Sequence, residues 1–319
     1  MKTSRLLVVV VMAAAAAAPC THFVVAGQPE LSRSARAQDD VRILASSDMG
    51  GRRTGSDGSR KAQAFLQTRF AALGLKPFGA AYAKPFSIKA PVTPGQPHAG
   101  AYRSAVNYIG YLAGSASAKR FIVISAHYDH LGIKNGVLYP GADDNASGVA
   151  AMLAIAAWFK DHPPRHSIVF AAFDGEELGL QGARAFLAAL PFAKAQLALN
   201  LNLDMVSRND RHQIYVAGTR YAPQLTPLVA QAAARSSSVD VKFGHDRPQL
   251  RADAAEDWTN ASDHGPFHEA GVPFLYFGVE EHAGYHAPSD TFEHVNQRFF
   301  AGVLDLLVDV AATLDAELK

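Results

Sequence analysis

The sequence predicts an α/β protein: a three-layer α/β/α sandwich around a mixed, mostly parallel sheet. Short apolar runs rich in β-branched and aromatic residues alternate with longer segments of helical spacing. Several of these runs are apolar at nearly every position, which is typical of strands that helices cover on both faces. Polar residues follow the runs directly. Because open α/β sheets bind ligands at the carboxyl ends of their strands, these polar residues form the candidate site.

The expected elements follow one another between residues 39 and 318. Apolar spacing predicts helices at 39–47, 58–75, 147–160, 181–190, 223–234 and 299–318, and in 58–75 it places Leu66, Phe70 and Leu73 on one face. Apolar runs predict strands at 108–112, 121–126, 167–173, 195–205, 212–217 and 273–278. The Gly-rich residues 50–55 are expected to form a loop. Residues 76–105, rich in Pro, Gly and Ala, are expected to form short strand-like pieces and a loop at 89–100.

Length and composition point to one domain over residues 39–319. The chain has 319 residues, of which 49% are hydrophobic, so it can bury a sizeable core, and we find no internal repeat or large insertion. A net charge of +1 with 18% charged residues gives no sign of nucleic acid as a partner. Cys20 is the only cysteine, so metal ligands would have to be His, Asp and Glu.

The beginning of the sequence has the pattern of an export signal. Two basic residues precede an apolar stretch, Leu6–Ala18, which is too short to span a bilayer easily. Small-residue cleavage sites end at Ala26 and Ala37. We therefore expect a signal peptide over residues 1–26, or one cleaved as late as Ala37. The mature protein would be periplasmic or extracellular, with no membrane span after signal removal.

Three consecutive expected strands deliver acidic and histidine side chains to their carboxyl ends. The strand at 121–126 leads into His127, the next into Glu176 and Glu177, and the third into Asp204. Glu176 and Glu177 leave the strand end in different directions, so one can bind a metal while the other faces a substrate water. Asp204 lies in an apolar segment, where an unpaired carboxylate would be costly. The pattern predicts metal-assisted hydrolysis.

Residues near His127 offer a supporting carboxylate and a rival ligand. Asp129 lies two residues further on, so on a strand its side chain would point the same way and could hydrogen-bond the His127 imidazole. His130 could also bind a metal, but it lies past the expected strand end. From the residues alone, His127 is the better ligand candidate.

Two other segments contain more candidates than a site needs. Asp143 and Asp144 precede the helix at 147–160, where one carboxylate could simply cap the helix and the other bind a metal. The loop after the strand at 273–278 contains His282 and His286, either of which could be a ligand. Tyr285, next to His286, would be placed to donate its hydroxyl to a developing oxyanion.

Three common catalytic motifs are absent from the sequence. It has no His-Glu-x-x-His helix of the one-zinc metalloproteases and no Gly-x-Ser-x-Gly nucleophile elbow. It also has no Gly-x-x-x-x-Gly-Lys phosphate-binding loop. A single-zinc protease helix, serine-hydrolase chemistry and P-loop nucleotide chemistry are therefore not indicated.

Taken in order, these motifs resemble those of the secreted co-catalytic di-zinc aminopeptidases, the family that includes aminopeptidase Y and the bacterial leucyl aminopeptidases. The resemblance covers roughly residues 40–315. It is carried by His127-x-Asp129, the run 141–148, Glu176-Glu177, Asp204, Ser262-Asp263-His264 and Tyr285-His286.

The resemblance implies two Zn²⁺ ions per chain in a zinc exopeptidase-like fold. It implies that His127 and Asp204 bind one zinc, that Glu177 and His286 bind the other, and that Asp144 bridges both. The family bridge immediately precedes a residue that matches Asn145 here, and the resemblance implies a cis peptide bond between the two.

The resemblance also assigns roles to three further residues. Glu176 would be the general base, Asp129 would orient His127, and Tyr285 would be the oxyanion donor. The implied activity is the removal of N-terminal residues from peptides with a free N-terminus, through a water activated by two zinc ions. Trp258 and Phe267 are candidate pocket residues.

Other readings remain open at the sequence level. A glutaminyl cyclase of this type would use one zinc. A carboxypeptidase would need a basic pocket, for which Arg208, Arg211 and Arg220 are candidates. A non-catalytic binding protein would be expected to have lost a ligand or the base, and all six positions are filled. A structural envelope protein would leave the strand-end carboxylates unexplained.

Overall fold

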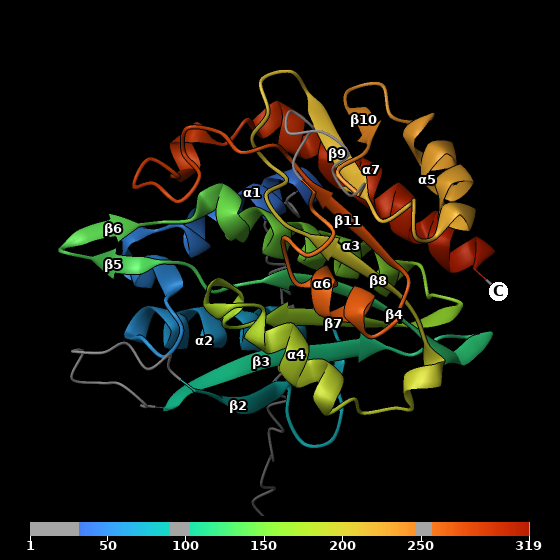
Figure 1. The fold of residues 1–319 in the computed structure, drawn as a ribbon, viewed down its shortest axis with the longest axis horizontal. Helices are drawn as coiled ribbons and strands as arrows, with labels where there is room; N and C mark the ends of the chain where they lie inside the picture. Colours follow the sequence, from blue (N-terminus) through green and yellow to red (C-terminus); the bar gives the residue numbers. More distant parts are fainter. Residues whose placement is uncertain (1–31, 90–101, 247–256, 319) are drawn as a thin grey trace, which may run out of the picture. The chain divides into compact units, whose positions relative to one another are not determined.

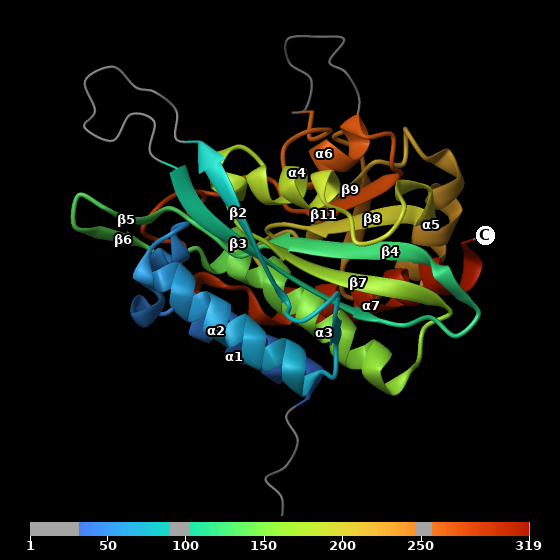
Figure 2. The same cartoon turned by 90° about the horizontal axis from the view of Figure 1, so that it is seen from below.

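The sheet lies between two layers of helices. The structure is a computed structural model that describes residues 32–89, 102–246 and 257–318. In this part of the chain nine strands form one sheet, in the order β1-β3-β7-β4-β8-β11-β9-β10, with β2 paired to β3. Figures 1 and 2 show α1, α2, α3 and α7 on one face of the sheet and α4 and α6 on the other. The predicted three-layer α/β/α class is confirmed.

The elements have the following bounds. The helices are α1 Arg33–Leu44, α2 Asp57–Ala72, α3 Gly148–Asp161, α4 Gln181–Ala188, α5 Thr226–Ala233, α6 His264–Glu269 and α7 Gln297–Glu317. The strands of the large sheet are β1 Lys76–Pro77, β2 Ala83–Lys89, β3 Tyr102–Leu112, β4 Ser117–His127, β7 His166–Phe173, β8 Leu197–Leu203, β9 Gln213–Ala217, β10 Asp240–Phe243 and β11 Phe274–Gly278. A separate hairpin consists of β5 Gly132–Lys134 and β6 Val137–Tyr139.

The sheet is mixed, with a parallel centre. β7, β4, β8 and β11 pair in parallel with their neighbours in this series, whereas β3 runs antiparallel to β7 and β9 antiparallel to β11. Every residue of β7 and β8 is buried, as expected for strands covered on both faces. The carboxyl ends of β7, β4 and β8 therefore meet at one edge.

Side chains of β4 alternate between two cores. Ile122 and Ile124 pack into the larger core with the helices of one face, whereas Val123 packs into the smaller core on the other. The strand period of two residues thus supplies apolar side chains to both layers.

Among the described residues, no helix is long and apolar enough to cross a membrane.

Several elements differ from the sequence prediction, among them strand β10 and helix α6, which were not predicted. The first helix begins at Arg33 rather than at residue 39, because the Ser32 hydroxyl accepts a hydrogen bond from the backbone N–H of Ala35 and caps it. The β5–β6 hairpin was not predicted. The export signal expected over residues 1–26 and most of the loop expected at 89–100 lie outside the described residues.

Candidate metal centre

The parallel strands bring the predicted acidic and histidine residues to one edge of the sheet. His127 is the last residue of β4, Glu176 and Glu177 follow β7, and Asp204 follows β8. Because β4 pairs in parallel with both β7 and β8, the three strand ends are neighbours. The side chains gather there because each of them lies at or just after the carboxyl end of a parallel strand.

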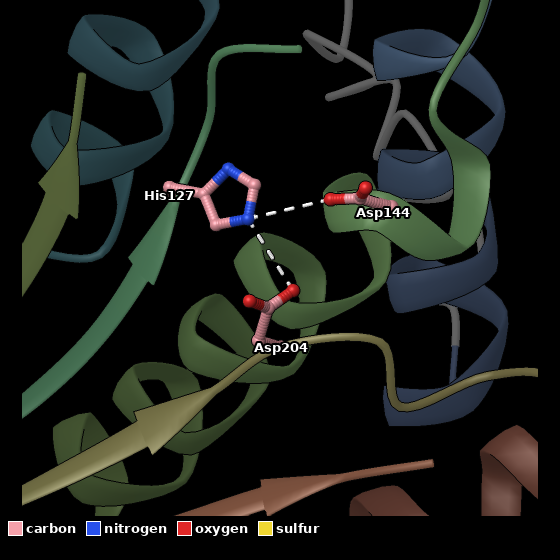
Figure 3. Close-up of side chains that lie close together, drawn as sticks. All are labelled: His127, Asp144 and Asp204. Atoms are coloured by element: carbon pink, nitrogen blue, oxygen red, sulfur yellow. Dashed lines mark hydrogen bonds and ion pairs between the residues drawn. The ribbon is translucent and has the colours of Figure 1, made fainter. Parts of the chain in front are cut away.

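The first group of side chains surrounds the Nε2 atom of His127. This atom lies 3.3 Å from Asp204 Oδ1 and 3.4 Å from Asp144 Oδ1. Figure 3 marks both contacts with dashed lines. Glu176 Oε2 lies further away, at 4.0 Å. All three ligand candidates, His127, Asp144 and Asp204, are buried.

The electrostatics of this group favour a positive charge between its members. Burial would lower the pKa of His127, but the carboxylates of Asp204 and Glu176 outweigh burial and raise the pKa well above its ordinary value. Burial would raise the pKa of Asp204, but the charge and hydrogen bond of His127 lower it. A cation at this point is therefore stabilised, whether a proton or a metal ion provides it.

The second group lies on the other side of the Asp144 carboxylate. His286 Nε2 lies 3.1 Å from Asp144 Oδ2 and 3.5 Å from Glu177 Oε2. His130 Nδ1 lies 2.7 Å from Glu177 Oε1 and 3.6 Å from Asp144 Oδ2. The two oxygens of Asp144 thus face two separate sets of potential ligands, which is the geometry of a bridging carboxylate.

His130 is closer to this second group than the sequence suggested. Its ring is fully buried, and burial lowers its pKa to about 3, so the ring is neutral. Sequence reasoning ranked His130 behind His127 because it follows the strand, without showing that the loop turns its ring toward Glu177. The sequence placed both His127 and His130 at or just after the end of the same strand, so this position did not show which of them faces Glu177.

The turn that carries Asp144 is fixed from several sides. The peptide bond Asp144–Asn145 is cis, which confirms the prediction. The Asp290 carboxylate accepts hydrogen bonds from the backbone N–H groups of Asp143 and Asp144, and the Asn145 side chain donates to the carbonyl oxygen of Leu203. These contacts set the direction of the Asp144 side chain.

Asp143 and His282, the rivals of Asp144 and His286, pair with each other. His282 Nε2 lies 2.9 Å from Asp143 Oδ2, and Asp143 Oδ1 accepts hydrogen bonds from the backbone and hydroxyl of Ser207. The pair ties the loop that carries His286 to the turn that carries Asp144. The structure therefore places Asp143 and His282 beside the two ligand groups rather than in them.

The Asp129 carboxylate supports Glu176 rather than the His127 ring. Asp129 Oδ1 accepts a hydrogen bond from the Glu176 backbone N–H at 3.1 Å, and Oδ2 accepts one from the Thr54 hydroxyl. His127 Nδ1 lies 3.1 Å from the backbone carbonyl oxygen of Asp129 but 3.8 Å from its carboxylate. The sequence predicted that the Asp129 carboxylate would contact the His127 ring. In the structure the backbone carbonyl group of Asp129 makes the closer contact, because the chain turns directly after the strand.

Arg52 holds the loops behind the centre and was not predicted. Its side chain is fully buried, and its guanidinium donates hydrogen bonds of 2.6–2.8 Å to four backbone carbonyl oxygens. These belong to Leu44, Tyr128, Pro140 and Gly141. Arg52 therefore links the segment after His127 to the segment before Asp144.

A cleft of about 400 Å³ opens over both groups. Trp258, Tyr276 and Met205 contribute apolar surface, and Glu281 contributes an exposed carboxylate. No lysine or arginine is among the described residues that line it. The prediction that Trp258 lines a pocket is confirmed. The one for Phe267 is wrong, because its ring is buried in the smaller core.

This fold and this site define a class: an α/β protein whose histidine and carboxylate side chains converge as in metal-assisted hydrolases. Residues 107–311 match peptidase family M28, and the chain belongs to that family. The predicted family resemblance is thus confirmed.

Curated relatives are similar over part of their length. Aminopeptidase YwaD of Bacillus subtilis is 31% identical over 205 residues, which cover 62% of this chain and 41% of YwaD. A probable zinc metalloprotease of Pyrenophora tritici-repentis is 33% identical over 200 residues, which cover 53% of this chain and 45% of that protein. The chain therefore spans less than half the length of these relatives.

Solved structures show the same fold at low sequence identity. The zinc aminopeptidase BSAP from Bacillus subtilis has a TM-score of 0.69 at 20% identity, covering 87% of this chain and 94% of that chain. The glutaminyl cyclase of Porphyromonas gingivalis has a TM-score of 0.70 at 20% identity, covering 87% and 97%. Two activities thus occur on this fold, so the fold does not separate them.

Proposed function

We propose that this chain is a zinc-dependent exopeptidase that removes N-terminal residues from peptides and uses two zinc ions. The observation that carries the proposal is the Asp144 carboxylate, whose Oδ1 faces His127 and whose Oδ2 faces His286. One carboxylate between two ligand sets is what a pair of metal ions requires. Membership of peptidase family M28 supports the reaction class.

The side chains fit two zinc ions. Zinc accepts imidazole nitrogen and carboxylate oxygen. We assign His127 and Asp204 to the first ion, Glu177 and His286 to the second, and Asp144 to both. Among the described residues, the buried atom Glu177 Oε1 has no hydrogen-bond partner, a state that is costly without a bound cation.

The proposed mechanism gives Glu176 the proton transfers. When bound, the zinc ions lower the pKa of a shared water and polarise the substrate carbonyl. Burial raises the pKa of Glu176 well above its ordinary value; the charge of His127 opposes this rise, and the Asp204 carboxylate adds to it. Glu176 can therefore take the proton of the attacking water and pass it to the leaving amine. Asp129 holds the Glu176 backbone in place.

Tyr285 is the proposed oxyanion donor. It lines the cleft, and its ring stacks on His286 with centroids 4.0 Å apart. Burial and the nearby Asp144 carboxylate raise the pKa of Tyr285, so the hydroxyl keeps its proton and can donate it in a hydrogen bond.

The charge of the cleft favours the amino end of a peptide. A free carboxylate would need a cation, and none of the three candidate arginines lines the cleft. Arg211 pairs with Glu280, Arg220 lines a different pocket, and Arg208 lies against Gly284. The acidic groups of the cleft can instead bind a substrate ammonium group, so we favour an aminopeptidase over a carboxypeptidase.

Metal content and substrate choice test the proposal together. Zinc per chain is measured by atomic emission, and hydrolysis is followed with aminoacyl-nitroanilides and their N-acetylated forms. We expect two zinc ions per chain, hydrolysis of the free forms alone, and loss of activity with a chelator. One zinc ion with cyclisation of N-terminal glutamine would contradict the proposal and support a cyclase.

We also propose that the chain is exported and that residues 39–319 form one peptidase domain. The basic start followed by the apolar stretch Leu6–Ala18 supports export. Cell fractionation and N-terminal sequencing of the mature protein test this. A cytoplasmic protein that retains Met1 would contradict it.

A further inference from the structure

We propose that His130 is a third histidine of the metal centre and that its Nδ1 atom binds the second metal ion beside Glu177, Asp144 and His286. The inference rests on the two-metal centre proposed above. It changes the composition of the second position, which then has two imidazole ligands instead of one.

The first observation is the relation between His130 Nδ1 and Glu177 Oε1. The two atoms are 2.7 Å apart, yet neither has a hydrogen-bond partner among the described residues, because the ring nitrogen is not directed at the oxygen. Ligand atoms of His130, Asp144 and Glu177 all lie within 4.8 Å of one another, close enough to bind one metal ion. Within this group, Asp144 Oδ2 lies 3.6 Å from His130 Nδ1.

The second observation is that His130 differs from the histidines that serve the core. In His166, Nδ1 lies 3.0 Å from the carbonyl oxygen of Asp315, and in His264, Nε2 lies 2.6 Å from that of Trp258. Both rings are buried, and each is anchored through one nitrogen. His130 is equally buried, and within the described part of the chain neither of its ring nitrogens has such a partner. An ordinary core role does not explain an imidazole without any hydrogen bond.

The third observation is that the backbone at Gly141 packs closely against the His130 ring. Gly141 has φ +64°, and a Cβ atom there would lie 2.2 Å from the carbonyl oxygen of Asp144 and 2.6 Å from Cγ and Cδ2 of His130. The carbonyl oxygen of Gly141 accepts a hydrogen bond from the Arg52 guanidinium, which also donates to the carbonyl oxygen of Tyr128. The ring is therefore held between two segments that a single guanidinium fixes, which is the preorganisation expected of a metal ligand.

Cadmium-113 NMR tests the inference on the unaltered chain. The protein is labelled with ¹⁵N-histidine and loaded with ¹¹³Cd²⁺, and one-bond ¹¹³Cd–¹⁵N couplings are counted. We expect two bound ions and three coupled nitrogens, one on the first ion and two on the second. His130→Gln should remove one coupling of the second ion. Two ions with a single coupled nitrogen each would overturn the inference and leave the proposed function standing, whereas a chain that binds no ion would overturn the proposed metal centre.

Chelator competition separates ligation from a hydrogen-bonding role. His130→Asn keeps an amide that can donate to Glu177 but lacks the imidazole. We expect the second Zn²⁺ to bind at least about tenfold more weakly and the first to bind unchanged. Unchanged affinity for both ions would overturn the inference. His166→Asn is the matched control, because it replaces an equally buried histidine at the other end of β7 and should leave both affinities unchanged.

Discussion

The two halves of the candidate metal centre differ in the secondary structure that carries their side chains. The first half consists of His127 and Asp204, which adjoin the ends of two paired central strands and are buried. The second half depends on loops: His286 follows the last strand, its side chain is 40% exposed and its φ is +50°. The sheet positions the first half directly. Glu177 of the second half lies close to the end of β7, whereas the place of His286 depends on contacts between loops.

Those loop contacts can be named. Asp290 holds the turn that carries Asp144, and the Asp143–His282 pair joins that turn to the His286 loop. They lie beside the ligands and touch none of the groups that would bind metal. A change in the Asp143–His282 pair should therefore affect the second half and spare the first. A change in Asp144, or in Asp290, which holds its turn, should affect both.

The largest effect is expected from Asp144→Ala, which removes the side chain that both halves share. Both zinc ions should bind much more weakly, and kcat/KM should fall about a thousandfold or more, because the metal contribution to the transition state is lost. Metal analysis after gel filtration and steady-state kinetics measure this. Asp161→Ala, at the exposed end of α3, is the control. If one ion stayed bound with full affinity, the bridging role would be wrong.

Glu176→Gln and Glu177→Gln should separate proton transfer from metal binding. Glu176→Gln should keep both zinc ions and lower kcat by about 10²–10⁴-fold, since a general base is lost. Glu177→Gln should weaken the second zinc ion and leave the first bound. Kinetics and metal content are measured on the same preparations. Equal metal loss in both variants would contradict the assignment.

Tyr285→Phe tests chemistry on the exposed loop without altering a proposed ligand. We expect kcat to fall about a hundredfold while KM and both metal affinities stay close to those of the unaltered chain, because only an oxyanion donor is removed. A rise in KM at constant kcat would instead show that Tyr285 binds the substrate in its ground state.

The smallest effect is expected from His282→Ala, which cuts the link between the two loops. The second zinc ion should bind about tenfold more weakly and the first should bind unchanged, as is usual when a supporting partner of a ligand is removed. Stepwise zinc titration measures both affinities. Equal weakening of both ions would mean that the two halves do not differ in their support.

The sequence predicted the strand-borne part of the centre better than the loop-borne part. Strand periodicity and the position of polar residues after apolar runs led to His127, the pair Glu176–Glu177 and Asp204. The choice between Asp143 and Asp144, and between His282 and His286, came from the family resemblance, since both members of each pair have suitable chemistry. The structure separates the pairs in space, because Asp143 and His282 bind each other.

Arg52 shows why the loop contacts were not predictable. It donates only to backbone carbonyl oxygens, which every residue carries, so no side-chain pattern marks its partners. The β5–β6 hairpin, by contrast, carries a turn signal in its sequence. Asn135-Gly136 joins the two strands with both φ angles positive, which is the sequence and geometry of a two-residue hairpin turn.

The buried guanidinium of Arg52 also bears on the order in which the protein is assembled. Burial lowers its pKa to about 10, so it stays positively charged at neutral pH, and the carboxylates of Asp144, Asp290 and Asp129 all attract it. A chain that has not yet met zinc therefore already contains one cation that offsets part of their mutual repulsion. We therefore expect the loops of the centre to be in place before a metal ion binds.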